Sequence, residues 1–231
     1  TPNQVGDVMR RAFHALRNGT PGPVVVELTA DVCAQDVPEV MQNYKSPKIY
    51  RQLPEPSAIE DAVMAYLNAK ERVIWAGSGV LFSGATEALR ELAELTASPV
   101  FCTMPGKSAF DERHPLALGA GSGTTTGPAH HWLTNSDVLL ALGSSLTRSP
   151  YAQNISPGKM IIHNTNNPDE LNKDEAADIG LIGDTRLTIE ALIACIKEKT
   201  DGSGAGDRSE VEANVAAVRA EWMAEWSPVL N

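Results

Sequence analysis

The chain has 231 residues, of which 42% are hydrophobic and 21% charged, the balance of an ordinary globular protein with one large or two small domains. Its formal net charge of −10 argues against nucleic acid and anionic membrane surfaces as partners, because both would repel it. The cysteines Cys33, Cys102 and Cys195 form no CxxC pair, which argues against a disulfide framework and a zinc site. We therefore expect a cytoplasmic protein without a membrane-spanning segment.

The first 35 residues are predicted to be the end of an upstream domain. Apolar residues recur at helical spacing between positions 5 and 16, and Gly19 ends the predicted helix. Pro21-Gly22-Pro23 predicts a turn, and the three valines at positions 24–26 predict a strand. A helix and one strand cannot bury a core by themselves. Residues 36–56, rich in proline, are predicted to be an interdomain linker.

Residues 57–200 are predicted to form the main domain. Ser57 and Glu60 have the spacing of a capping box, at the start of an amphipathic helix. Continuously apolar segments follow at 72–76, 99–103, 137–142, 159–163 and 178–182, with helical patterns at 85–93 and 189–196. Continuous apolar strands are typical of parallel sheets that are buried on both faces. The predicted fold class is therefore α/β, a doubly wound parallel sheet sandwiched by helices.

Residues 201–231 are predicted to be a flexible linker followed by a helix that leads towards a further domain. Ser209 and Glu212 have capping-box spacing. The apolar side of this helix has no evident partner elsewhere in the chain; it is formed by Val211, Val215, Val218 and Trp222. Because the chain begins with Thr1 and not with Met, we expect it to be an internal fragment of a longer protein.

Small and polar loops follow the predicted strands, where a doubly wound sheet binds its ligands. Glycines allow a ligand to approach the backbone, and N–H groups at helix starts attract phosphate, so an adenine-nucleotide cleft is one interpretation. The other is that short strand-to-helix turns need small residues anyway.

Several sharper chemistries lack their motifs. A GxGxxG fingerprint would need glycine at Phe82, and no G-x-S-x-G nucleophile elbow occurs. The neighbouring His130 and His131 would diverge on a helix and could not share a metal. The charged residues 111–114 favour a solvated surface over a catalytic loop.

Several strings, in order along the chain, resemble one enzyme family. They are Arg11-Ala12-Phe13, the PGPV turn at 21–24, Gly106-Lys107, His114-Pro115-Leu116 with Leu118-Gly119, Ser136-Asp137 with Leu139-Leu140 and Gly143, and Gly183-Asp184. The series resembles thiamine-diphosphate-dependent enzymes of the acetolactate-synthase type, from the tail of the pyrimidine-binding domain through the central domain. The family's central domain is a parallel αβα sandwich, in agreement with the fold predicted above.

This resemblance implies a full-length parent that uses thiamine diphosphate and Mg²⁺ to make or break a carbon–carbon bond in a 2-keto acid, as a transferase or lyase. The family's catalytic glutamate and its GDG motif with a later NN pair have no counterpart here, so this fragment alone is predicted to be inactive and to hold no metal. Other domains of the same polypeptide, further copies in a homo-oligomer and a small keto acid are the expected partners. The alternative is a free-standing nucleotide- or flavin-binding module of the same sandwich fold.

The resemblance also places a nucleotide cleft in the central domain, which takes FAD in acetolactate synthases, takes ADP in some relatives and stays empty in others. The positions that would match this cleft are Gly77, Gly79, Thr103, Met104, Gly121, Gly123, Gly143, Ser144, Asn164 and Asp184. Residues 143–148 lack the family's RFDDR string, and Asn164 and Asn166 stand where aspartates are common. We therefore rank an empty or ADP-type cleft above one with FAD, with Arg148 as the residue that could reach a phosphate.

Overall fold

The computed structural model describes residues 1–36, 39, 41, 44–121, 125–148 and 154–230. The chain divides into two compact units, Thr1–Arg51 and Gln52–Asn231, which are described separately below. None of the described helices is long and apolar enough to cross a membrane.

The first unit contains short helices and extended chain. Its elements are η1 (Pro2–Gln4), α1 (Val5–Arg17) and α2 (Ala30–Cys33), which confirms the predicted first helix. The predicted strand at 24–26 is wrong: these residues belong to no sheet, and Val25 is 85% exposed. A strand needs a neighbour to complete its hydrogen bonds. Among the described residues of this unit none is buried, so the unit has no core of its own.

The second unit is built on one sheet in which all neighbouring strands are parallel. Its strands are β1 (Arg72–Ala76), β2 (Val100–Cys102), β3 (Ala117–Ala120), β4 (Val138–Leu142), β5 (Met160–Thr165) and β6 (Ile179–Ile182). They lie in the order β3-β2-β1-β4-β5-β6. The predicted α/β fold class is confirmed. Only β3 lacked a sequence signal, because its small residues form no β-branched run.

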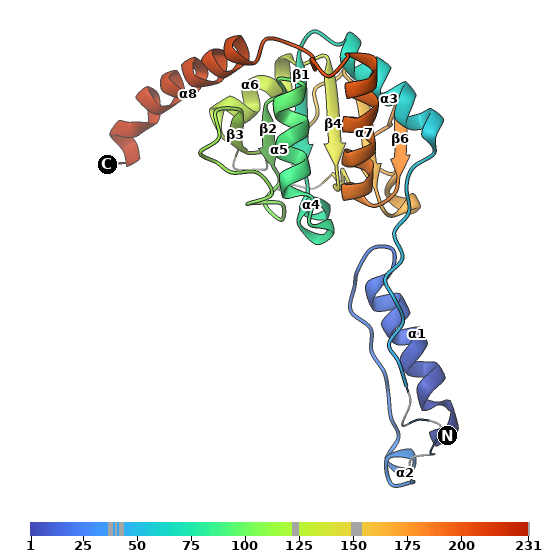
Figure 1. Cartoon of the computed structure of the whole chain (residues 1–231). Coiled ribbons are helices and arrows are strands. Elements are labelled where there is room, and N and C mark those ends of the chain that lie inside the picture. Colours follow the sequence, from blue (N-terminus) through green and yellow to red (C-terminus); the bar gives the residue numbers. More distant parts are fainter. Residues whose placement is uncertain (37–38, 40, 42–43, 122–124, 149–153, 231) are drawn as a thin grey trace. The chain divides into compact units, whose positions relative to one another are not determined.

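Helices cover both faces of this sheet, and each face has its own apolar core. Helices α3 (Pro56–Asn68), α5 (Thr86–Leu95) and α7 (Thr185–Lys199) pack together on one face, with α5 and α7 side by side in Figure 1. Helices α6 (Gly127–Asn135) and α8 (Arg208–Leu230) pack together on the other. The short α4 (Ser78–Ser83) and η3 (Pro168–Glu170) follow β1 and β5.

Two predicted capping boxes are wrong. Helix α3 begins at Pro56, before Ser57, because proline already has the helical φ angle and needs no hydrogen-bond partner at the first position. At α8 the side chain of Asp207, before Ser209, accepts a hydrogen bond from Glu210 N at 3.2 Å. A carboxylate in this position satisfies one of the free N–H groups of the first turn.

The expectation that the apolar side of α8 has no partner within the chain is also wrong. Val215 is fully buried, and Val211 and Val218 pack against the core beneath α6. The Trp222 indole lies so close to Gly127 that a Cβ at this glycine would be 2.5 Å from the ring. Arg219 donates a hydrogen bond to Ala117 O. The domain boundaries proposed from the sequence remain a prediction.

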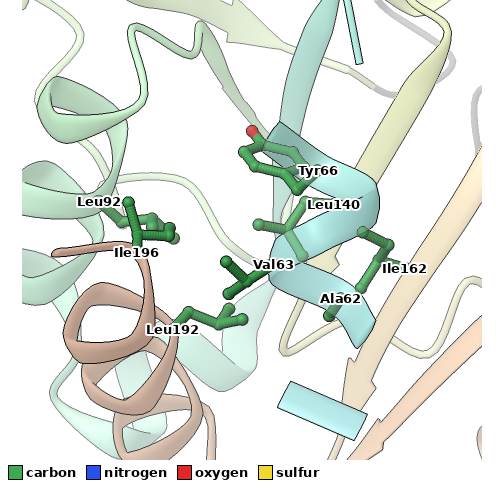
Figure 2. A pocket seen from close by; sticks show the side chains of 8 residues that line it. All are labelled: Ala62, Val63, Tyr66, Leu92, Leu140, Ile162, Leu192 and Ile196. Atoms are coloured by element: carbon green, nitrogen blue, oxygen red, sulfur yellow. The ribbon is translucent and has the colours of Figure 1, made fainter. Parts of the chain in front are cut away.

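The core beneath α3, α5 and α7 contains a small apolar void (Figure 2). It measures about 10 Å³, which is at most the room of one water molecule, and such an apolar void stays dry. Tyr66, the only lining residue with a polar side chain, donates its hydroxyl proton to Ser98 Oγ at 2.8 Å. Burial raises the pKa of Tyr66 to about 12, so the hydroxyl stays protonated. The void is therefore a packing defect without the means to bind a polar ligand.

Arg72, at the start of β1, joins the ends of two helices. Its guanidinium donates to Tyr66 O at 2.8 Å and Leu67 O at 3.1 Å in the last turn of α3, and to Thr96 O at 3.4 Å after α5. The last carbonyl groups of a helix have no partner within the helix, and a cation is favourable there. Arg72 thus ties the amino end of the sheet to α3 and α5.

Replacing this arginine should weaken the whole second unit. We expect Arg72→Met to lower the free energy of unfolding by about 3 kcal/mol, because three carbonyl groups lose a charged donor. Arg113→Met, at a side chain that is 90% exposed in its ion pair with Asp111, should change it by less than about 0.5 kcal/mol. Urea denaturation of both variants measures the difference; equal effects would contradict the role of Arg72.

Candidate functional site

The carboxyl ends of β1 and β4 form the centre of the candidate site. The chain order runs outward from β1 to β3 on one side and from β4 to β6 on the other, so the strand order switches between β1 and β4. Ligands of doubly wound sheets bind in the crevice at such a switch point. The predicted residues Gly77, Gly143 and Ser144 lie in the segments that leave these strands, and Gly79 lies in the first turn of α4, which follows β1.

The segments that follow β1 and β4 touch through their backbones. Gly79 N donates to Gly143 O at 2.9 Å, and a Cβ at Gly79 would lie 2.6 Å from Gly143 Cα. A Cβ at Gly77 would lie 2.3 Å from Gly143 O. Gly143 itself has a φ of +60°, a left-handed conformation that favours glycine. The three glycines are therefore needed for close packing of one loop on the other.

The predicted polar residues at β5 and β6 are engaged inside the protein. Asn164 is fully buried, and its amide donates to Leu181 O at 2.9 Å, Gly183 O at 3.1 Å and Thr188 Oγ1 at 3.1 Å. Asp184 caps α7, since its carboxylate accepts from Arg186 N and Leu187 N, both at 3.1 Å. Asn164 thus holds the ends of β5 and β6 together, and Asp184 begins the next helix.

The remaining predicted positions have mixed surroundings. Thr103 Oγ1 accepts from Gly106 N at 3.1 Å and fixes the turn after β2, whereas Met104 is 53% exposed. A Cβ at Gly121 would lie 2.3 Å from the Phe101 ring, so this glycine is also required by packing. Gly123 lies outside the described residues.

Two residues that the sequence interpretation missed fix the loop after β4. Leu146 has a φ of +47° and is only 5% exposed, because its side chain enters the core beneath α6. His163 on β5 is fully buried, and its Nε2 lies 2.7 Å from Ser144 O. Burial lowers the pKa of His163, so the neutral ring donates from Nε2 and leaves Nδ1 without a hydrogen-bond partner. A histidine within a predicted strand was the only available signal.

Arg148, expected to reach a phosphate, is already paired. Its guanidinium contacts both carboxylate oxygens of Glu175, at 2.7 and 3.1 Å, and its backbone N donates to Asp174 at 3.0 Å. Glu175 is the more buried partner of this pair, with 14% of its side chain exposed. The loop after β4 is therefore tied to the segment before β6 through Arg148.

Among the charged residues 111–114, His114 connects its own turn to Glu94 at the end of α5. His114 Nδ1 accepts from Leu116 N at 3.1 Å, so its Nε2 carries the proton that points to Glu94, 3.0 Å away. Arg208 lies 3.5 Å from the same carboxylate. Helix α6 carries His130 and His131, and in the described part of the chain no three His, Cys, Asp or Glu side chains could hold a metal ion.

The model of the central domain of thiamine pyrophosphate enzymes matches residues 59–192. The chain belongs to this family. A probable acetolactate synthase large subunit from Methanocaldococcus jannaschii is 33% identical over 204 residues, which cover 84% of this chain and 34% of that protein. Glyoxylate carboligase from Escherichia coli O157:H7 is 28% identical over 194 residues, 83% of this chain and 33% of that protein. The chain thus spans about a third of the length of the curated relatives it matches.

A solved structure shares the fold of this central domain. The benzoylformate decarboxylase from Polynucleobacter necessarius aligns with a TM-score of 0.73 at 23% identity, over 90% of this chain and 38% of that chain. The likeness agrees with the parallel sheet and its two helical layers.

The described residues of this central domain do not form a site for thiamine pyrophosphate and its metal. Asp184 and Asn164, two polar positions of the predicted nucleotide cleft, are held by internal hydrogen bonds. No cluster of metal ligands exists in the described ranges to bind a cation beside a diphosphate. No chemical step of the family is therefore assigned to these residues.

The structural role of Asp184 can be tested directly. We expect Asp184→Ala to lower the free energy of unfolding by about 1 kcal/mol through loss of the α7 cap, whereas Asp184→Asn keeps a capping oxygen and should stay within about 0.5 kcal/mol of the parent. Denaturant unfolding of the two variants decides the matter. An asparagine variant as unstable as the alanine variant would show that the charge, and not the cap, is what matters.

The contacts of Glu94 with His114 and Arg208 should make the free energy of unfolding depend on pH in the acid range. The hydrogen bond from His114 lowers the pKa of Glu94 below its ordinary value of 4.5, with Arg208 and Arg90 as further causes. A lowered pKa in the folded state contributes stability above the ordinary value, and this contribution is lost as the pH falls through the lowered pKa. Glu94→Gln should therefore flatten the loss of stability below about pH 5. Glu87→Gln, on the exposed side of α5, is the matched control and should keep the parent's slope.

Proposed function

We propose that this chain is the central domain of a longer thiamine pyrophosphate-dependent enzyme that acts on 2-keto acids, as a carboligase or a decarboxylase. The match of the central-domain model to residues 59–192 is the observation that carries the proposal. The names of the relatives, acetolactate synthase and glyoxylate carboligase, support carbon–carbon bond chemistry on small keto acids. In such an enzyme thiamine pyrophosphate would be bound by other parts of the protein and would supply an electron sink for the chemistry at the keto group.

The proposed role of this domain is mechanical. Its strand-end polar groups, Asn164, Asp184 and Arg148, are engaged in internal contacts, which supports a structural role for them. Exposed apolar residues outside the sheet support association with other domains or copies, for example Val25 and Leu28 in the first unit and Trp226 near the end of α8.

We further propose Mg²⁺, a homo-oligomer and a cytoplasmic location for the full-length protein. A diphosphate cofactor needs a cation to neutralise it, and Mg²⁺ suits phosphate oxygens. The exposed apolar residues support contacts between subunits. The cysteines are free in the described structure, in agreement with a reducing compartment.

Turnover by the full-length protein tests the proposed function. With thiamine pyrophosphate and Mg²⁺ we expect consumption of pyruvate, glyoxylate or benzoylformate, measured as CO₂ release and identification of the ligation product. The present chain, under the same conditions, should give none and serves as the control. No turnover of any keto acid by a folded, cofactor-loaded full-length protein would refute the proposal, and turnover by the present chain would refute the mechanical role.

A further inference from the structure

We infer that the strand-order switch of this chain is a sealed structural joint that holds neither FAD nor ADP. The resemblance to the acetolactate-synthase type leaves FAD, ADP or an empty cleft as the options at this crevice, and the described residues do not fit either nucleotide. This inference concerns the joint alone and does not require the proposed turnover. It rests on three independent observations, which concern the backbone, the loop after β4 and the charges.

Three of the backbone donors that could cradle a diphosphate are already used. Gly77 N donates to Leu142 O at 2.9 Å, Gly79 N to Gly143 O at 2.9 Å, and Val80 N to Gly77 O at 3.2 Å. A dinucleotide is held by free N–H groups at the start of the helix that follows the first strand. Here α4 has only six residues, and these three N–H groups bond to protein oxygens.

The loop after β4 closes over the joint. Leu146 adopts a left-handed conformation, which is costly for a residue with a side chain, and its burial in the core beneath α6 offsets that cost. Trp75 on β1 lies opposite Ala141 on β4, and Ala141 lies opposite His163 on β5. Trp75 and Ala141 belong to the same core as Leu146. His163 holds the loop by its 2.7 Å contact with Ser144 O. The loop is thus anchored on both sides of Ser145.

The charge around the joint does not suit a diphosphate. In the segments 77–79, 103–106, 143–148 and 183–184, which directly follow their strands and are all described, Arg148 is the only cation. The next cation after β2, Lys107, is paired with Glu112 at 2.7 Å. Arg148 is paired with Glu175, and Asp174 accepts from its backbone. An incoming diphosphate would have to break this pair and would meet two carboxylates, which repel it.

Nucleotide binding to the purified chain is the direct test. We expect no flavin absorbance near 450 nm in the purified chain, and no saturable heat in calorimetric titrations with FAD or ADP up to about 1 mM. Co-purified flavin, or saturable binding of either nucleotide in that range, would overturn the inference. A full-length protein that turns over keto acids without flavin would leave both the inference and the proposed function standing. One that requires FAD bound in this crevice would overturn the inference and leave the function intact.

Two glycine variants test the joint itself. Gly143→Ala places a Cβ 2.7 Å from Gly79 Cα, whereas Gly158→Ala, at a φ of +85°, meets nothing within 4 Å. Both substitutions place alanine in an unfavourable left-handed conformation. The difference between their melting temperatures therefore reports the contact between Gly143 and Gly79. We expect Gly158→Ala to lower Tm by about 5 °C or less, and Gly143→Ala to lower it by about 10 °C or more or to prevent folding. Melting temperatures within about 2 °C of each other would show that the close contact between Gly143 and Gly79 is not needed for stability, and would contradict the inference.

Discussion

The pairing of β1 with β4 is the constraint on which the second unit depends. The two strands are matched over their whole length, from Arg72 opposite Val138 to Ala76 opposite Leu142. The sheet extends from this pair in both directions, so β1 is the first strand of one half of the sheet and β4 is the first strand of the other. Both strands are almost wholly buried, since helices cover each face. Parallel strands need this double burial, which explains why their residues are apolar without alternation.

The same pairing extends beyond the strands and determines what the carboxyl edge can do. The ladder continues through Gly77 N to Leu142 O, and Gly79 then bonds to Gly143 O. Once the two loops touch, only glycine fits at these positions, and their N–H groups are no longer available to a ligand. A crevice that binds dinucleotides in other doubly wound sheets becomes, in this chain, a place where the two halves of the sheet are joined.

The candidate site was predictable in position but not in role. Parallel strands bring their carboxyl ends to one edge, and Gly77, Gly143, Asn164 and Asp184 all lie there as expected. Their chemistry depends on neighbours that are distant in sequence. The Asn164 amide donates its hydrogen bonds to β6 and α7. The carboxylate of Asp184 accepts from the first turn of α7. A polar residue at a strand end has the same sequence signature whether it binds a ligand or the protein itself.

The fold class, five of the six strands, the helices α1, α3, α5, α7 and α8, and the family resemblance could be predicted from the sequence, because these depend on local periodicity and short motifs. Helix α6 was not predicted. Which segments pack against a partner depends on the folded chain. The valines at 24–26 have the composition of a strand but pair with no strand among the described residues, whereas Val215 packs in the core beneath α6. Leu146 is buried in a strained conformation that no local preference favours. Strand pairing and burial require contacts between residues that are distant in sequence. A local sequence pattern is compatible with such contacts but does not specify the partner.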